Sequence, residues 1–144
     1  MNFTKNQQNA IDTRDCSLII SAGAGSGKTA VLTERILDRI CNENDDCNID
    51  DFLIVTFTNA AAKELSDRIR KKLSERAAEN PLNKKILNNI ALLPLAKIST
   101  INSFCYEIVK DNFHKLGLSA SLRIADEAEM ALVREKILNE VVDD

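Results

Sequence analysis

The sequence feature that most constrains this chain is a cluster of glycines between an apolar run and an amphipathic segment. Three of the four glycines among its 144 residues lie within five positions, at 23, 25 and 27. The apolar run at residues 17–21 precedes them and predicts a strand buried on both faces. Residues 27–42 follow, with an apolar side chain at every fourth position from 32 to 40, and predict a helix.

The glycine-rich segment, AGAGSGKT at residues 22–29, matches the Walker A pattern G-x-x-x-x-G-K-[ST] except at its first position. Glycines suit a loop whose backbone N–H groups converge on phosphate oxygens. Lys28 would neutralise the β- and γ-phosphates, the Thr29 hydroxyl would ligate Mg²⁺, and the helix N-terminus would add its dipole. The predicted ATP-binding residues here are Ala22, Gly23, Ala24, Gly25, Ser26, Gly27, Lys28 and Thr29, the last two also as catalytic residues. The alternative is a tight turn that happens to precede Lys-Thr.

The rest of the chain alternates between apolar runs and amphipathic segments. Further strands are predicted at residues 52–57 and 96–101, and an acidic, polar loop at residues 42–51. The predicted helices are residues 4–13, 59–75 (apolar at 61, 65, 69 and 73), 82–93 with Pro81 at its first position, 103–115 ended by Gly117, and a last one from Asp126. Strand–helix alternation predicts an α/β fold, a doubly wound parallel sheet flanked by helices.

Composition excludes several classes of protein. The net charge of −3 argues against a uniformly basic nucleic-acid coat, so nucleic-acid contact would need a local patch or stacking. No apolar run is long enough to span a membrane, and the N-terminus has no signal-peptide core, so we expect a cytoplasmic chain without membrane contact. The spacing of the four cysteines, with a single histidine, favours reduced thiols over a zinc site.

Small polar residues follow the second and third predicted strands. Carboxyl ends of parallel strands meet at one sheet edge, so these residues and the phosphate loop are expected to share it. Neutral donors suit phosphate oxygens, and an aromatic ring can stack on a base. The candidate DNA-binding residues are Phe57, Thr58, Asn59, Thr100, Asn102 and Ser103. The alternative is that the polar residues are ordinary helix caps and Phe57 belongs to the core.

Four segments together resemble the motifs of superfamily 1A DNA helicases. Residues 3–11, FTKNQQNAI, resemble the Q motif, in which Gln7 would read the adenine edge of ATP. Residues 22–29 have that superfamily's A-x-x-G-x-G-K-T form of the phosphate loop, which accounts for Ala22. Residues 55–65 look like motif Ia and residues 98–105 like motif Ib, with Asn102 where the family usually has His. The resemblance implies part of a P-loop NTPase motor lobe of the RecA type.

Within the superfamily, the chain is most similar to the AddA branch of helicase-nucleases. Motif Ia reads Thr-Asn-Ala-Ala-Ala, motif Ib reads Ile-Ser-Thr-Ile, and residues 122–129 look like the start of that branch's second subdomain. The resemblance implies an ATP- and Mg²⁺-dependent helicase and exonuclease that processes DNA double-strand breaks for recombinational repair with an AddB-type partner. It assigns residues 1–115 to a partial first motor lobe and residues 116–144 to the start of a helical subdomain. The alternatives are a UvrD/Rep-type helicase without nuclease, or a nucleotide-binding chain without turnover.

The second acidic motif of an ATPase, an apolar strand ending in Asp-Glu, is not convincing in this sequence. Only Asp126-Glu127 could supply it, but the preceding run is short and broken by Arg123, and Asp126 with Glu129 instead predicts a capping box. We therefore expect an N-terminal piece of a larger enzyme without the catalytic acid. The basic cluster at residues 68–72 is interpreted as a solvated helix face, Cys105 as a small core residue and His114 as a surface residue.

Overall fold

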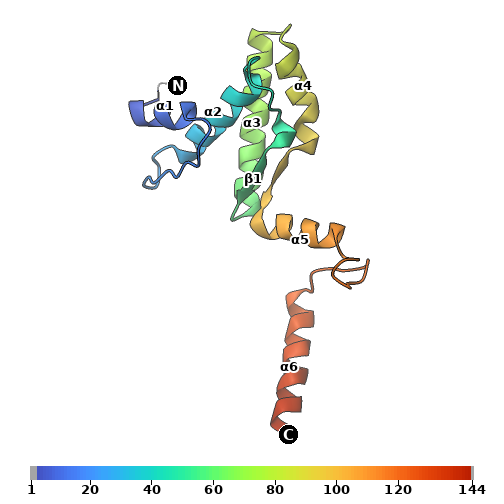
Figure 1. Ribbon diagram of the computed structural model, residues 1–144. Coiled ribbons are helices and arrows are strands. Elements are labelled where there is room, and N and C mark those ends of the chain that lie inside the picture. The colour runs from blue at the N-terminus through green and yellow to red at the C-terminus, as the bar shows by residue number, and fades with distance from the viewer. Residues whose placement is uncertain (1–2, 144) are drawn as a thin grey trace. The chain divides into compact units, whose positions relative to one another are not determined.

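The computed structural model describes residues 3–143, which divide after Phe104 into two compact units. Figure 1 shows the elements along the chain. The first unit contains α1 (Lys5–Asp12), α2 (Lys28–Cys41), the 3₁₀ turn η1 (Ile49–Asp51), β1 (Leu53–Thr56), α3 (Asn59–Glu79), α4 (Lys84–Leu92), the 3₁₀ turn η2 (Leu93–Leu95) and β2 (Lys97–Thr100). Helix α5 (Ile101–Asp111) begins in the first unit and ends in the second, and α6 (Glu127–Asp143) belongs to the second.

The two strands form a parallel pair. Leu53 lies opposite Lys97 and Thr56 lies opposite Thr100, so both strands end at the same level. Helices α3 and α4 connect them, which is the crossover that parallel strands require. The α/β class and the parallel pairing predicted from the sequence are therefore confirmed.

The strand predicted at residues 17–21 is absent, and this part of the predicted doubly wound sheet is wrong for the described residues. They form a two-stranded sheet in which β1 and β2 pair with each other. Residues 17–21 are irregular and exposed, Ile19 to 95%. A strand needs a hydrogen-bonded neighbour, and an apolar, β-branched run does not by itself supply one.

The core lies between α2, α3 and α4. Ile36, Leu37 and Ile40 on the second half of α2 pack in one buried cluster with Leu65, Ile69 and Leu73 of α3. The predicted stripe on α3 is confirmed at these last three positions, but its first member is the buried Ala62, and Ala61 is exposed. Helices α3 and α4 lie side by side (Figure 1).

Three helix and loop boundaries differ from those predicted. Helix α3 continues to Glu79, and α4 begins only at Lys84, because the Asn83 side chain caps it by accepting the Ile86 N–H at 3.0 Å. Pro81 therefore lies in the turn before the helix. The loop predicted to be polar contributes one core residue, Ile49, because η1 turns its side chain into the cluster.

The fully buried Asn89 on α4 joins three segments of the first unit. Its Oδ1 accepts the Ile49 N–H at 2.7 Å, and its Nδ2 donates to the Ile40 carbonyl at 2.9 Å and to the Lys85 carbonyl at 3.0 Å. A buried amide is tolerated only when its donors and acceptors are paired, which is the case here. Asn89 thus fixes the end of α2 and the turn η1 against α4.

The second unit consists of the rest of α5, a series of turns and α6. Gly117, with φ +66°, lies in the turns after α5, and the Tyr106 hydroxyl donates to the Leu122 carbonyl at 2.9 Å. The predicted capping box is confirmed: Asp126 Oδ1 accepts the Glu129 N–H at 2.9 Å, and Glu129 Oε2 accepts the Asp126 N–H at 3.1 Å. Since residues 122–126 form no strand, the rejection of Asp126-Glu127 as a strand-end acidic motif agrees with the structure.

Replacing Asn89 is expected to destabilise the first unit. Asn89→Ala leaves the Ile49 N–H and the Ile40 carbonyl buried without their partner, which costs about 2–4 kcal/mol of unfolding free energy. The exposed neighbour Asn88, changed to Ala, should change it by less than about 0.5 kcal/mol. Urea denaturation followed by circular dichroism measures both, and equal effects would contradict this role of Asn89.

Candidate functional site

The glycine-rich loop at residues 22–29 folds over its own lysine. Lys28 Nζ donates to the Ala22 carbonyl at 2.7 Å and to the Gly23 carbonyl at 2.6 Å, and Ser26 Oγ donates to the Gly23 carbonyl at 2.8 Å. Gly25 and Gly27 have φ values of +73° and +82°, in the left-handed region that favours glycine. Two glycines are therefore required by the backbone itself, as the motif predicted.

One side of this loop is open. A Cβ atom built on Gly23 or Gly25 would meet no other atom within 4 Å, so the backbone there is accessible. The loop leads into α2, where Lys28 and Thr29 occupy the exposed first turn. An accessible, glycine-rich backbone before a helix N-terminus, next to one ammonium group, has the chemistry of an anion site.

Gln7 connects α1 to this loop. Its side chain completes a capping box with Thr4, accepting the Thr4 N–H at 2.9 Å through Oε1. Its Nε2 donates to the Ser26 carbonyl at 3.1 Å. The structure thus brings Gln7 to the phosphate loop, 19 residues away in sequence.

Gln7 and the loop also share a cavity. It has a volume of about 290 Å³ and is lined by residues of α1, of the loop and of the first turns of α2. Its polar lining includes Gln7, Ser26 and Lys28, and its apolar lining includes Ala10, Ile20 and Val31. An apolar wall facing a few polar groups is the usual lining of a small-molecule site.

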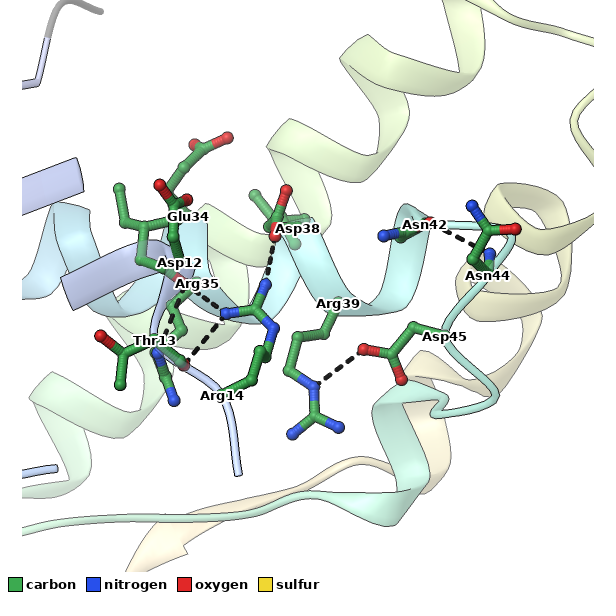
Figure 2. Close-up of polar contacts among 12 residues, drawn as sticks. Asp12, Thr13, Arg14, Glu34, Arg35, Asp38, Arg39, Asn42, Asn44 and Asp45 are labelled. Carbon is green, nitrogen blue, oxygen red and sulfur yellow. Dashed lines mark hydrogen bonds and ion pairs between the residues drawn. The ribbon is translucent and has the colours of Figure 1, made fainter. Parts of the chain in front are cut away.

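Two arginines hold α1 against α2 at the opposite end of α1. Arg35 of α2 donates to the Ala10 carbonyl at 2.7 Å and to the Ile11 carbonyl at 3.3 Å. Arg14 donates to the carbonyls of Ile11 and Thr13 and forms an ion pair with Asp38 (Figure 2). These arginines satisfy carbonyls that the last turn of a helix leaves without intrahelical partners.

The second group of predicted residues lies where β1 and β2 end. Thr56 and Thr100 are partners across the sheet, so the segments after them are neighbours. Phe57 is 93% exposed and does not belong to the core. Asn59 and Asn102 are also exposed, in the first turns of α3 and α5.

Helix capping explains the remaining three polar residues at this edge. The Thr58 hydroxyl accepts the Ala61 N–H at 3.1 Å. The Thr100 hydroxyl accepts the Ser103 N–H at 3.1 Å and lies 2.8 Å from the Ser103 hydroxyl. Both hydroxyls at strand–helix junctions therefore have structural roles.

The prediction that the phosphate loop shares this sheet edge is wrong for the described residues. No strand leads into the loop, which is positioned by α1 and α2 instead. The structure therefore brings together two groups of candidate residues, Gln7 with the loop, and residues 57–59 with residues 100–103.

The basic cluster on α3 is partly used in ion pairs. Arg68 pairs with Glu64 one turn away, while Lys72 and Arg76 both pair with Glu34 of α2. Burial alone would raise the pKa of Glu34, but the hydrogen bonds and charges of Lys72 and Arg76 outweigh it, and the pKa lies below its usual value. The prediction of a simply solvated face is correct for Arg70 and Lys71, which are exposed, and incomplete for Lys72.

The cysteines and His114 offer no catalytic arrangement. Cys105 is exposed, so its prediction as a core residue is wrong, while His114 is exposed as predicted. Burial raises the pKa of the Cys41 and Cys47 thiols, which disfavours the reactive thiolate. Within residues 3–143, no group of three or more His, Cys, Asp and Glu side chains could hold a metal ion.

Comparison with known proteins decides the family. Residues 3–144 match the UvrD/REP helicase N-terminal domain. The chain belongs to this family. Among relatives named as an ATP-dependent helicase/nuclease of the AddA type, it is 47% identical over 99% of its length to that of Clostridium acetobutylicum, 49% over 94% to that of Lachnoclostridium phytofermentans, and 44% over 99% to that of Clostridioides difficile.

The chain spans only 11%, 10% and 11% of these three relatives, so it corresponds to about a tenth of their length. The resemblance to the AddA branch of superfamily 1A helicases is confirmed. Each helix in the described part of the chain is too short or too polar to cross a membrane.

Sequence reasoning missed the two arginines that hold α1. Arg14 lies in an irregular segment and Arg35 on a charged helix face, and neither belongs to a motif. The available signal was weak: a basic residue beside Asp38 in the fold cannot be paired with it from sequence distance alone. Their role follows only from the packing of α1 on α2.

The Glu34 ion pairs predict a pH dependence of stability. Because the folded pKa of Glu34 is lowered, its contribution is present above its unfolded pKa of about 4.3 and is lost as the pH falls through the lower folded value. Glu34→Gln should lower the unfolding free energy at pH 7 and weaken its decline between about pH 5 and pH 3. Urea denaturation across this range is the measurement. The exposed Glu75 is the control, and a pH profile unchanged in Glu34→Gln would contradict the assignment.

Proposed function

We propose that this chain binds ATP with Mg²⁺ and forms part of the motor of an ATP-driven DNA helicase-nuclease. The observation that carries the proposal is the loop at residues 22–29, with its accessible glycine backbone and the Lys28 ammonium over it. Its sequence form, its position before α2 and the family of the chain all support a phosphate site.

The residues present fit a nucleotide. The predicted ATP-binding residues Gln7 and 22–29 surround one cavity or the loop beside it. We propose that Lys28 neutralises phosphate charge and that the loop N–H groups orient the phosphates. The Thr29 hydroxyl is one oxygen ligand for Mg²⁺, which takes its remaining ligands from phosphates and water. Bound Mg²⁺ would neutralise charge that develops during phosphoryl transfer.

The activity of the whole protein is proposed from the relatives named ATP-dependent helicase/nuclease. In this proposal residues 1–115 belong to a RecA-type first motor lobe and residues 116–144 to the start of a helical subdomain. The parent processes double-strand breaks with an AddB-type partner in the cytoplasm. Since Asp126 and Glu129 cap α6, we propose that the acid which orients the attacking water comes from outside the described residues.

The edge formed by β1 and β2 is proposed as part of the single-stranded DNA track. Phe57, 93% exposed beside exposed amides, would stack on a base, and Asn59 and Asn102 would donate to phosphates. Thr58, Thr100 and Ser103 would act through the helix N-termini that they cap. The alternative functions, a helicase without nuclease and a nucleotide-binding chain without turnover, share the phosphate loop.

The phosphate site is tested by Lys28→Ala. Loss of the ammonium should weaken ATP binding at least tenfold without changing the unfolding free energy by more than about 0.5 kcal/mol, because Lys28 is exposed. Isothermal titration calorimetry with Mg-ATP measures the affinity. Lys84→Ala, an exposed lysine at the start of α4, is the control. ATP affinity unchanged in Lys28→Ala would contradict the phosphate-site assignment.

The DNA track is tested by Phe57→Ala. Loss of one stacked base should weaken binding of oligothymidylate roughly 5- to 100-fold. Leu82→Ala removes an apolar side chain that is 91% exposed at the start of the α3–α4 turn, and it should leave the affinity unchanged. Fluorescence anisotropy of a labelled oligonucleotide is suitable, and equal affinities of both variants would exclude Phe57 from the track.

A further inference from the structure

We propose that Gln7 is a positioning residue for the phosphate loop, in addition to the adenine contact that its motif implies. The proposal rests on the proposed ATP-binding function and deepens it. Gln7 Nε2 donates to the Ser26 carbonyl at 3.1 Å, and this bond exists within the chain itself, without any base. Gln7 therefore acts on the part of the site that contacts phosphate.

The orientation of the Gln7 amide is fixed by its own helix. Oε1 accepts the Thr4 N–H at 2.9 Å, while the Gln7 N–H faces the Thr4 hydroxyl at 3.4 Å. With the oxygen held at the N-terminus of α1, the NH₂ group is left to point to the loop. The capping box thus selects the amide orientation that donates to Ser26.

The bond to Ser26 orients the next peptide N–H. In a trans peptide the carbonyl oxygen and the following N–H point in opposite directions. Since the Ser26 carbonyl points to Gln7, the Gly27 N–H points away from Gln7. Gly27 N–H is one of the backbone donors by which this motif holds phosphate, so Gln7 sets the direction of a phosphate-binding group.

Gly27 also lies directly against the Gln7 amide. A Cβ atom at Gly27 would lie 3.3 Å from Gln7 Nε2, whereas at Gly23 and Gly25 it would meet nothing within 4 Å. Gly27 also has φ +82°. The one glycine of the loop that Gln7 touches is therefore the one that leads into α2 and Lys28.

The support for Gln7 extends through α1. Ile11 of α1 and Val31 of α2 are buried, and Arg35 donates to the carbonyls of Ala10 and Ile11. Because both ends of α1 are attached, one to the loop and one to α2, Gln7 is held by a rigid element. A residue held in this way can restrain a loop.

The two roles of Gln7 separate when the ligand has no base. A residue that only reads adenine does not affect the binding of inorganic tripolyphosphate, whereas a residue that positions the loop does. Gln7→Ala is therefore expected to weaken tripolyphosphate binding about threefold to tenfold, the worth of one hydrogen bond. Its effect on ATP binding should be at least as large.

The experiment is calorimetric titration of the whole chain with Mg-ATP and with tripolyphosphate. The variants are Gln7→Ala, the matched control Gln8→Ala and the reference Lys28→Ala. Gln8 is the exposed neighbour on α1, and its side chain bonds Asp12 of the same helix at 2.7 Å. Gln8→Ala should bind both ligands as the unaltered chain does.

A second measurement separates positioning from loss of fold. Hydrogen exchange of the loop amides without ligand should be faster in Gln7→Ala than in the unaltered chain, while α2 keeps its protection. If Gln7→Ala weakens ATP binding and leaves tripolyphosphate binding and loop exchange unchanged, this proposal is overturned and the phosphate site stands. If the unaltered chain does not bind tripolyphosphate, or Lys28→Ala binds it equally well, the proposed function is overturned, and this proposal with it.

Discussion

The attachment of α1 to α2 is the interaction on which the phosphate loop depends. A phosphate loop in a parallel sheet is held at one end by the strand that leads into it, but residues 17–21 form no strand here. The loop is instead held between Gln7 on one side and the first turn of α2 on the other. Arg14 and Arg35 make this possible, because they bond the last carbonyls of α1 and keep it against α2 (Figure 2).

The second half of α2 connects this arrangement to the core. Leu37 and Ile40 are fully buried against α3 and α4, and Asn89 bonds the Ile40 carbonyl. The first half of the same helix begins with Lys28 and Thr29, which are exposed. One helix therefore has a buried end that fixes its position and an exposed end that presents the loop. The low flexibility of a packed helix makes the exposed end a defined site.

Local patterns in the sequence predicted local structure well and partnership poorly. The capping residues Thr4 and Asp126, the spacing of Leu65, Ile69 and Leu73 and the glycines of the loop all act within a few positions, and all are found in the structure. The strand at residues 17–21 was wrong because strand formation depends on a neighbour elsewhere in the chain.

The candidate site shows the same division between local and long-range structure. The loop residues were found from their motif, and Gln7 was found from a resemblance, since nothing in its own pattern shows that it reaches Ser26. Exposure separates Phe57 from the core, which its apolar character could not do. Cys105 was misplaced for the opposite reason, because a small apolar side chain at a helix start does not specify which face is covered.

The distribution of charge explains how an acidic chain can present an anion site. Arg14, Lys72 and Arg76 each pair with a carboxylate, so much of the positive charge is neutralised within the fold. Lys28 differs: its hydrogen bonds go to two backbone carbonyls, and no carboxylate lies within 4.0 Å of it among the described residues. Its charge therefore remains available next to an accessible glycine backbone. A single uncompensated ammonium at a helix N-terminus attracts a phosphate over a short range, which requires no basic surface and agrees with the net charge of −3.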